Sequence, residues 1–232
     1  MIYKQKSFQR NLQKKINFEI VFCYNDTIII KRIKMQIIAK PCGVYATNCY
    51  IIKHAKGDFI IDAGQGGAEF VRQNATNPRA ILCTHGHFDH IWDCAAVKKE
   101  FQIPIYIHKD DEFMLADPFE MGHLHAKADF LVADENELDI SGVKFRFLHF
   151  AGHTPGCCMI ELVGENVAFS GDFLFKGTVG RYDFPYSDAN LMRQSLERVV
   201  KFKQNLRLLP GHGDETSLQA EQANLRYFIN VI

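Results

Sequence analysis

The sequence predicts an α/β (α+β) protein in which two mixed β-sheets stack face to face with helices on their outer sides. Three observations support this class. Apolar strand-like runs alternate with helical patterns, the two halves of the chain have a similar element order, and 47% of the 232 residues are hydrophobic. A chain of this size can bury a substantial core as one domain. Elements with one apolar face must bury it against each other, which favours stacked sheets covered by helices.

In the first half of the chain, the expected strands are short apolar runs bounded by turn residues. They are 36–40, 48–53, 58–62, 80–84 and 103–107. Helical spacing of apolar residues, helped by a glycine-rich turn before the first helix, predicts helices at 67–75, 89–100 and 109–116.

The second half follows the same theme. Strands are expected at 144–149, 158–163, 166–170 and 206–209. Helices are expected at 188–202 and 215–229. No sequence repeat is clear, but the similar order of elements favours two stacked sheets with helices outside.

The densest chemical feature is the heptapeptide Thr84-His85-Gly86-His87-Phe88-Asp89-His90, directly after the apolar run 80–83. Histidine is the commonest protein ligand for borderline metals, and carboxylate is a common oxygen partner. A chain of this size needs no metal to hold its fold, so a metal here would serve chemistry.

Three later loops carry a single histidine or aspartate in the same relative place, after an apolar run and among glycines. They contain His153, Asp172 and His212. Several loops that each follow a strand can bring their side chains to one edge of a sheet. The sequence therefore predicts a metal site assembled from distant segments.

The spacing within the heptapeptide favours two metals. His85 and His87 alternate along an extended loop and project to one side, so both can reach one ion. Asp89 and His90 lie in the first turn of the next helix and can reach a second ion. Two such ions about 3.5–4 Å apart can share a carboxylate and a hydroxide, and Asp172 is the expected bridge.

Residues 1–34 differ in composition from the rest. They hold eight Lys and Arg against Glu19 and Asp26, so the remainder is acidic by six charges in a chain of zero net charge. We expect a basic N-terminal extension, either a misplaced start or a β-hairpin around Asn25 and Asp26, ahead of a domain at 35–232. The charge balance and the lack of a long apolar run predict neither nucleic-acid nor membrane binding.

The seven cysteines form no Cys-x-x-Cys pair, and several lie in apolar runs. Reduced, buried thiols of this kind are typical of a cytoplasmic protein. Adjacent strand residues point to opposite faces, so Cys157 and Cys158 are expected to pack in the core rather than serve the site.

Together, these loops and Ile61-Asp62-Ala63-Gly64 resemble the metallo-β-lactamase superfamily over most of residues 35–232. The resemblance implies a four-layered αββα sandwich. It also implies one metal on His85, His87 and His153, a second on Asp89, His90 and His212, and Asp172 between them. Asp62 would be a buried scaffold residue.

Within that superfamily, residues 171–185 look most like short bacterial glyoxalase II-like hydrolases, which act on thioesters such as S-lactoylglutathione. The implied reaction is hydrolysis by a hydroxide shared between two divalent ions, zinc in first place and iron or manganese as alternatives. Asp89 would also orient the hydroxide. The Lys and Tyr usual in this segment of that branch are here Arg181 and Asp183.

Two alternatives stay open. A persulfide dioxygenase would hold one Fe(II) on His85, His153 and Asp172, and would leave His87 and His90 free. The loop 210–213 matches the hydrolase branch better. A metal-binding module without turnover is the third hypothesis, weakened because all seven ligand positions carry competent side chains.

A small-molecule substrate is expected to meet the segment after Asp172. Arg181 offers a planar fork of donors and Lys176 a mobile charge, so both are candidates for holding a substrate carboxylate. Tyr182 and Tyr186 are candidates for lining the pocket. Each of these side chains could equally be an ordinary surface residue.

Overall fold

The computed structural model describes residues 19–24, 27–32 and 35–232. The chain divides into two compact units, Met1–Gln36 and Ile37–Ile232. In the first unit, β1 (Glu19–Tyr24) and β2 (Thr27–Arg32) pair antiparallel, with Glu19 opposite Arg32 and Tyr24 opposite Thr27. Residues 1–18, 25–26 and 33–34 lie outside the described part.

The first sheet has the strand order β3-β4-β5-β6-β7-β8. Its strands are β3 (Met35–Cys42), β4 (Thr47–His54), β5 (Gly57–Ile61), β6 (Pro78–Leu82), β7 (Ile105–His108) and β8 (Phe130–Val132). β4 and β5 pair antiparallel, whereas β5 through β8 pair parallel, so the sheet is mixed. The parallel strands are joined by helical crossovers, as parallel pairing requires.

The second sheet has the order β16-β15-β12-β11-β10-β9. Its strands are β9 (Leu138–Ile140), β10 (Val143–His149), β11 (Cys158–Leu162), β12 (Val167–Gly171), β15 (Arg207–Pro210) and β16 (Thr216–Ser217). Only β12 and β15 pair parallel here. A small separate pair, β13 (Leu174–Phe175) with β14 (Thr178–Val179), follows Asp172.

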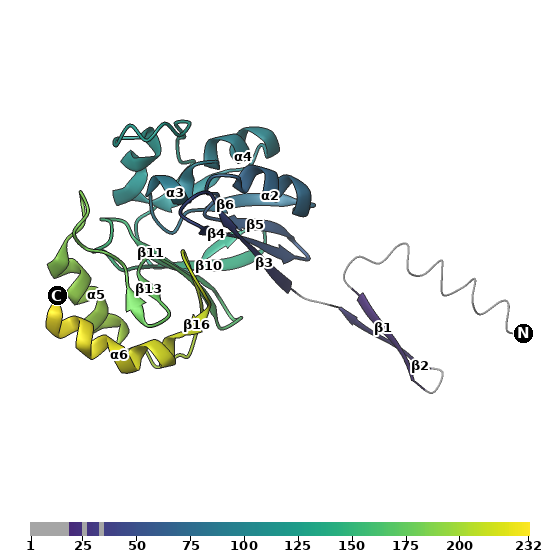
Figure 1. Cartoon of the computed structure of the whole chain (residues 1–232). Helices are drawn as coiled ribbons and strands as arrows, with labels where there is room; N and C mark the ends of the chain where they lie inside the picture. The colour runs from purple at the N-terminus through teal and green to yellow at the C-terminus, as the bar shows by residue number, and fades with distance from the viewer. Residues whose placement is uncertain (1–18, 25–26, 33–34) are drawn as a thin grey trace, which may run out of the picture. The chain divides into compact units, whose positions relative to one another are not determined.

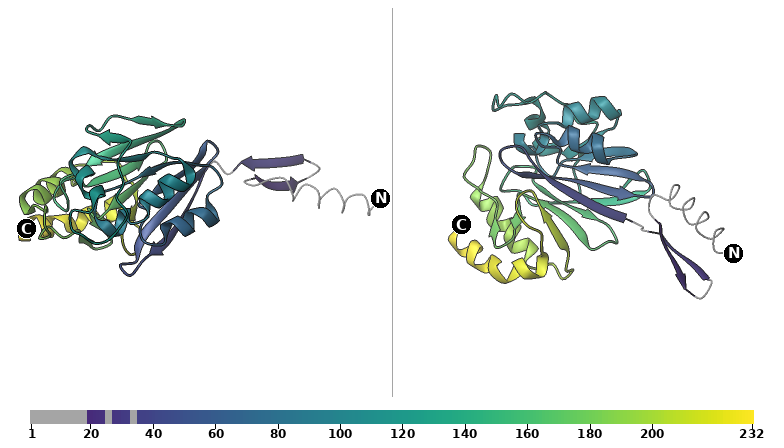
Figure 2. Two further views of the ribbon diagram at one scale, coloured as in Figure 1. Left: turned by 90° about the horizontal axis from the view of Figure 1, so that it is seen from above. Right: turned by 45° about the vertical axis from the view of Figure 1, so that its right-hand side comes forward.

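Aromatic rings join the inner faces of the two sheets. Phe59 of β5 meets Phe145 of β10 with ring centroids 5.0 Å apart, and Tyr50 of β4 meets Phe169 of β12 at 5.2 Å. The Tyr50 hydroxyl donates to the carbonyl of Pro210 at 2.7 Å, so its buried polar atom is satisfied. The sheets therefore stack, as the sequence predicted (Figures 1 and 2).

Helices cover both outer faces and complete four layers (Figure 1). Over the first sheet lie α2 (Gly67–Asn74), α3 (Phe88–Ile91), α4 (Cys94–Phe101) and the 3₁₀ helix η1 (Lys109–Ala116). Over the second sheet lie α5 (Ala189–Val199) and α6 (Leu218–Val231). In the part of the chain that the structure describes, no helix combines the length and apolarity needed to cross a bilayer.

Helix α5 shows why such elements form where they do. Asp188 caps it by accepting from the backbone N–H of Leu191 at 2.9 Å. Met192, Leu196 and Val199 recur at helical spacing and are buried, so the helix presents one apolar face to the sheet.

The prediction of a single helix at 89–100 is wrong in one respect. The segment forms two helices, α3 and α4, which are separated by Trp92 and Asp93. The side chain of Asp93 bonds to the N-terminus of another helix, α2. Its carboxylate accepts from the N–H groups of Gly66 and Ala68 and so caps α2. This tertiary contact has no signal in the local sequence.

Candidate metal centre

The ligands predicted from the sequence lie beyond the carboxyl ends of strands from both sheets. The segment His85–His90 follows β6 of the first sheet, and Asp62, the expected scaffold residue, follows β5 beside it. His153, Asp172 and His212 lie beyond β10, β12 and β15 of the second sheet. Because the sheets stack with these ends together, residues far apart in sequence meet in one place.

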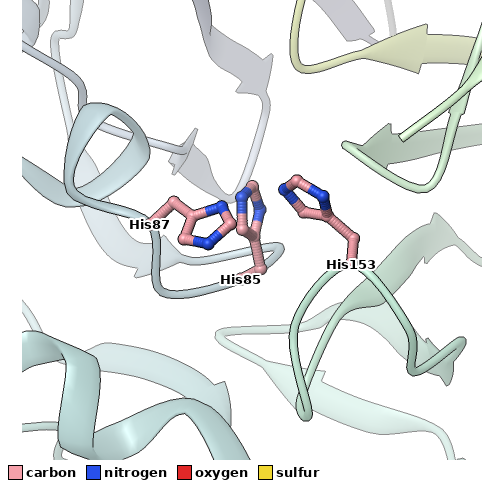
Figure 3. Close-up of side chains that lie close together, drawn as sticks. All are labelled: His85, His87 and His153. Atoms are coloured by element: carbon pink, nitrogen blue, oxygen red, sulfur yellow. The ribbon is translucent and has the colours of Figure 1, made fainter. Parts of the chain in front are cut away.

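His85, His87 and His153 form what we call the three-histidine cluster. The ring centroids of His85 and His87 are 4.9 Å apart, and His153 lies 5.0 Å from His85 and 4.5 Å from His87. One ligand atom from each lies within 4.8 Å of the others. The three rings point toward a common space (Figure 3). This spacing suits three imidazoles around one cation.

Asp89, His90 and His212 form a second cluster, also with one ligand atom each within 4.8 Å of the others. The Nε2 atom of His212 is 3.3 Å from Asp89 Oδ2, and that of His90 is 3.5 Å from the same oxygen. The structure thus brings together the sequence-predicted residues in two groups of three.

Asp172 lies between the two clusters. Its Oδ1 is 3.2 Å from His90 Nε2, and its Oδ2 is 3.4 Å from His212 Nε2 and 3.5 Å from His153 Nε2. Although burial opposes ionisation, the neighbouring His90 and His212 hold the pKa of Asp172 well below its usual range. An ionised carboxylate here can face both clusters at once.

The buried ligand atoms that lack hydrogen-bond partners show that these residues suit metal ions. His85 Nε2, His90 Nε2, His153 Nε2 and Asp172 Oδ1 are buried and have no hydrogen-bond partner. Such atoms are rare in folded proteins, because each forfeits its interaction with water. Cations held between the clusters would satisfy all four, with imidazole and carboxylate ligands that suit zinc, iron or manganese.

The opposite ring nitrogens are held by the protein, which fixes the orientation of each ring. His90 Nδ1 is 2.9 Å from Asp62 Oδ2, and the Asp62 carboxylate also accepts from the backbone N–H and hydroxyl of Thr84. The Nδ1 atoms of His153 and His212 donate to the carbonyls of Arg181 and Tyr45 at 2.7 and 3.0 Å. With its oxygens so engaged, Asp62 holds His90 and Thr84 in place, which is consistent with the scaffold role that the resemblance implies.

The two clusters differ in protonation. Burial lowers the pKa of all members of the three-histidine cluster, that of His87 to about 3, so these rings are neutral and free to bind a cation. Burial acts in the same direction on His90 and His212. There the carboxylates of Asp89 and Asp172 outweigh it and raise the pKa of His90 well above its usual range and that of His212 to about 9.

Asp111 is a site residue that the sequence motifs missed. It is fully buried in η1, and its Oδ2 accepts from Gly86 N at 2.9 Å and from the Thr154 hydroxyl at 2.6 Å. Its Oδ1 accepts from Gly156 N at 2.6 Å. Gly86 lies between His85 and His87, and Thr154 follows His153. One carboxylate therefore ties together the two loops that form the three-histidine cluster.

Close backbone packing explains two glycines beside Asp172. A Cβ on Gly180 would overlap the backbone oxygen of Asp172, and one on Gly211 would overlap its Oδ1. A side chain at either place would displace the central carboxylate, so glycine is required by space.

A cavity of about 750 Å³ opens beside the clusters and includes His87, Asp89, His153, Asp172 and His212 in its walls. Its volume is in the range of small-molecule sites. The cavity places the predicted ligands where a substrate can reach them.

The four predicted substrate contacts differ in position. Lys176 and Arg181 line the cavity. Tyr182 is outside its walls and packs against the hydrophobic cluster under α5 and α6. Tyr186 is also outside, and its ring meets that of Phe119, which does line the cavity, at 5.6 Å.

His108, Asp110 and His149 also bring possible ligand atoms close together. The two imidazoles stack at 4.0 Å with an interplanar angle of 16°, so their lone pairs lie in separate, nearly parallel planes, which is a poor arrangement for binding one ion. His149 Nε2 is 2.7 Å from the carbonyl of Pro155, which fixes that nitrogen as a donor. This group is structural.

Cys157 and Cys158 are both buried, and burial raises the pKa of both thiols well above the usual value. Raised pKa values disfavour the thiolate that a nucleophile or metal ligand needs. Cys157 packs in the cluster under α5 and α6. Core packing is therefore the role that the structure supports.

The fold and the two clusters define a class of protein that comparison with known proteins identifies. Residues 42–212 match the metallo-β-lactamase superfamily, and the chain belongs to it. Membership supports a metal-dependent hydrolase.

Relatives and solved structures agree. Hydroxyacylglutathione hydrolase GloC of Haemophilus influenzae is 32% identical over 203 residues, covering 81% of this chain and 95% of GloC. The BLEG-1 B3 metallo-β-lactamase has 31% identity and a TM-score of 0.75, covering 83% of this chain and 99% of its own. The di-iron-bound form of TTHA1623 has 30% identity and a TM-score of 0.67, covering 79% and 96%.

Proposed function

We propose that this protein is a hydrolase that uses two divalent cations, zinc in first place, to cleave a thioester or a related small acyl substrate. The three-histidine cluster would hold one cation, Asp89, His90 and His212 the other, and Asp172 both. The similarity to GloC supports a thioester, and S-lactoylglutathione serves as the reference substrate. No nucleic-acid or membrane partner is part of the proposal.

The observation that carries the proposal is that four of the buried atoms without hydrogen-bond partners lie together in the two clusters and on Asp172. His85 Nε2 and His153 Nε2 belong to one cluster, His90 Nε2 belongs to the other, and Asp172 Oδ1 lies between them. A single iron on His85, His153 and Asp172 would give His90 Nε2 no metal to bind, and this buried nitrogen would face Asp89 and Asp172 without a hydrogen bond of good geometry. Two cations account for all four atoms.

Bound cations would supply an activated water at neutral pH and polarise the substrate carbonyl. The protein positions the groups around them. Thr47 donates to Asp89 Oδ2 at 2.6 Å, which orients that carboxylate toward His212 and the cavity. Asp89 is thereby placed to accept a proton from an attacking water. A thiolate is a good leaving group and needs no residue to protonate it, so the proposed residue roles suit a thioester.

Metal analysis of the purified protein beside two assays tests this function. We expect two metal ions per chain, thioester hydrolysis, and no oxygen uptake with glutathione persulfide. Oxygen uptake with one iron per chain would establish the dioxygenase instead. Bound metal with no hydrolysis across a thioester and lactone panel would favour a module without turnover.

Two substitutions sharpen the test. We expect His87→Ala and Asp172→Ala to abolish turnover while the circular dichroism spectrum and the cooperative unfolding transition persist. Global unfolding of either variant would contradict a purely catalytic role for the metals.

The free thiols support a reducing, cytoplasmic setting as part of the proposal. Among residues 35–232, all six cysteines are buried and none forms a disulfide. The pKa of the Cys83 thiol is raised well above its usual value, first by its contact with Cys94 and then by burial. Protonated, inaccessible thiols suit a chain kept reduced.

A further inference from the structure

The walls of the cavity are mainly apolar outside the metal clusters. They include the side chains Phe88, Phe119, Met121, Phe175, Val179 and Phe184. These residues come from three separate segments of the chain, so the apolar lining is not the by-product of one hydrophobic strand.

The mouth of the cavity, its exposed rim, carries apolar side chains beside charged ones. Tyr45, Met121 and Phe184 line the cavity and are exposed, although each is large and hydrophobic. Exposed apolar side chains that surround a cavity are typical of binding sites. Their exposure is offset when an apolar substrate covers them.

The charges at this mouth are already paired. Arg181 donates from Nε and Nη2 to Asp183 at 2.9 and 2.8 Å, and its guanidinium lies 4.1 Å from the centre of the Phe184 ring. Lys176 Nζ is 3.1 Å from Asp214 Oδ2. Among the described residues that line the cavity, no other lysine or arginine occurs.

Paired cations have little to offer an anionic substrate. Both pairs are exposed and individually weak. A substrate carboxylate would share each cation with Asp183 or Asp214, so it gains less from charge pairing than it would at an unpaired cation. An apolar group, in contrast, gains from every surface it removes from water.

We propose that the site selects thioesters with an uncharged, apolar acyl chain over thioesters of charged thiols such as glutathione. This inference rests on the proposed function for the reaction and on the cavity for the choice of substrate. Arg181 and Lys176 then act with their partners as a neutral rim and do not clamp a carboxylate.

Binding of non-hydrolysable thioethers tests the selection without turnover. S-ethyl to S-octyl derivatives of N-acetylcysteamine are titrated into the zinc-loaded protein by calorimetry, with S-octylglutathione as the charged comparison. We expect Kd to fall about fourfold per methylene until the cavity is filled. The octyl compound without charge should bind at least about tenfold more tightly than S-octylglutathione. Equal or tighter binding of S-octylglutathione, or no dependence on chain length, would overturn the inference.

Kinetics then separate the inference from the proposed function. With S-acyl-N-acetylcysteamines from acetyl to octanoyl, kcat/KM should rise with chain length by a similar factor per methylene. Hydrolysis without that rise would overturn the selection and leave the hydrolase intact. Thioether binding as expected, with no thioester hydrolysed, would overturn the hydrolase and leave the selection intact.

Asp183→Asn tests the neutral rim. The substitution frees the Arg181 guanidinium, so the kcat/KM for S-lactoylglutathione relative to S-lactoyl-N-acetylcysteamine should rise about fivefold. The control Glu100→Gln removes a partner of the exposed Arg72 outside the cavity and should leave that ratio unchanged. An unchanged ratio in Asp183→Asn would show that the pairing does not govern selection.

Discussion

Replacing Asp111 by asparagine keeps the shape of the side chain and changes only its charge and hydrogen bonding. The carboxylate accepts three hydrogen bonds, two on Oδ2 and one on Oδ1. An amide has one oxygen, so its NH₂ group must face either Gly156 N or the pair Gly86 N and Thr154 Oγ1. At least one buried backbone N–H then meets another donor.

Two energies oppose each other in this variant. Loss of a hydrogen bond to a charged acceptor costs about 1.5–3 kcal/mol. Burial raises the pKa of Asp111 from 3.8 to about 6 although its hydrogen bonds lower it, so ionisation at pH 7 has a net cost of about 3 kcal/mol that the neutral amide avoids. We therefore expect the free energy of unfolding of the metal-free protein at pH 7 to change by less than about 1.5 kcal/mol.

The metal site should respond much more strongly than the fold. Asp111 holds the loop of Gly86 against the loop of Thr154. We expect Asp111→Asn to weaken zinc binding by about 10- to 100-fold, which is typical when a group that orients metal ligands is removed. Competition with a chromophoric chelator measures the affinity, and urea unfolding measures stability.

Asp117→Asn is the matched control. Asp117 is also buried and accepts from two backbone N–H groups, those of Met121 and Gly122, but it touches neither ligand loop. Its zinc affinity should stay within about twofold of the parent. Unchanged affinity in Asp111→Asn, or an equal loss in Asp117→Asn, would refute the role assigned to Asp111.

Three further predictions concern the groups around the metals. Asp62→Asn should weaken zinc binding by about 10- to 100-fold, because the hydrogen bond that orients His90 is weakened, and unchanged affinity by chelator competition would contradict this. Gly180→Ala should lower the free energy of unfolding by about 1–3 kcal/mol, since its Cβ would overlap the backbone oxygen of Asp172, and an unchanged urea midpoint would refute the overlap. Zinc binding beside His212 should release protons at pH 7 and weaken about tenfold per pH unit for each proton as pH falls, because the pKa of about 9 leaves this ring protonated without metal. The three-histidine cluster, whose pKa values are lowered, should bind zinc without such release above pH 6, and calorimetry in buffers of different ionisation enthalpy distinguishes the two sites.

The strands and the ligand loops could be predicted because their signals are local. The heptapeptide Thr84–His90 holds its chemistry in adjacent residues, and strands such as β11 and β12 are short apolar runs bounded by turns. Asp111 could not be found in this way. It lies in a 3₁₀ helix with no metal-ligand spacing, and its partners are 25 to 45 residues away in sequence.

The pairing of the charged side chains at the cavity is another property that could be established only from the structure. Arg181 and Asp183 are two residues apart, so their pairing is plausible from sequence. Lys176 and Asp214 are 38 residues apart and meet only because β13 and the loop after β15 lie near each other. From sequence alone both cations looked available to a substrate.

The metal ligands come from both sheets, so metal affinity depends on how the two sheets pack against each other. The segment His85–His90 belongs to the first sheet, whereas His153, Asp172 and His212 belong to the second. Metal bound by both sets adds its binding free energy to the packing of one sheet on the other. Any substitution that shifts this packing, such as one at the contact between Phe59 and Phe145, should therefore be detectable as a change in metal affinity before it is detectable as unfolding.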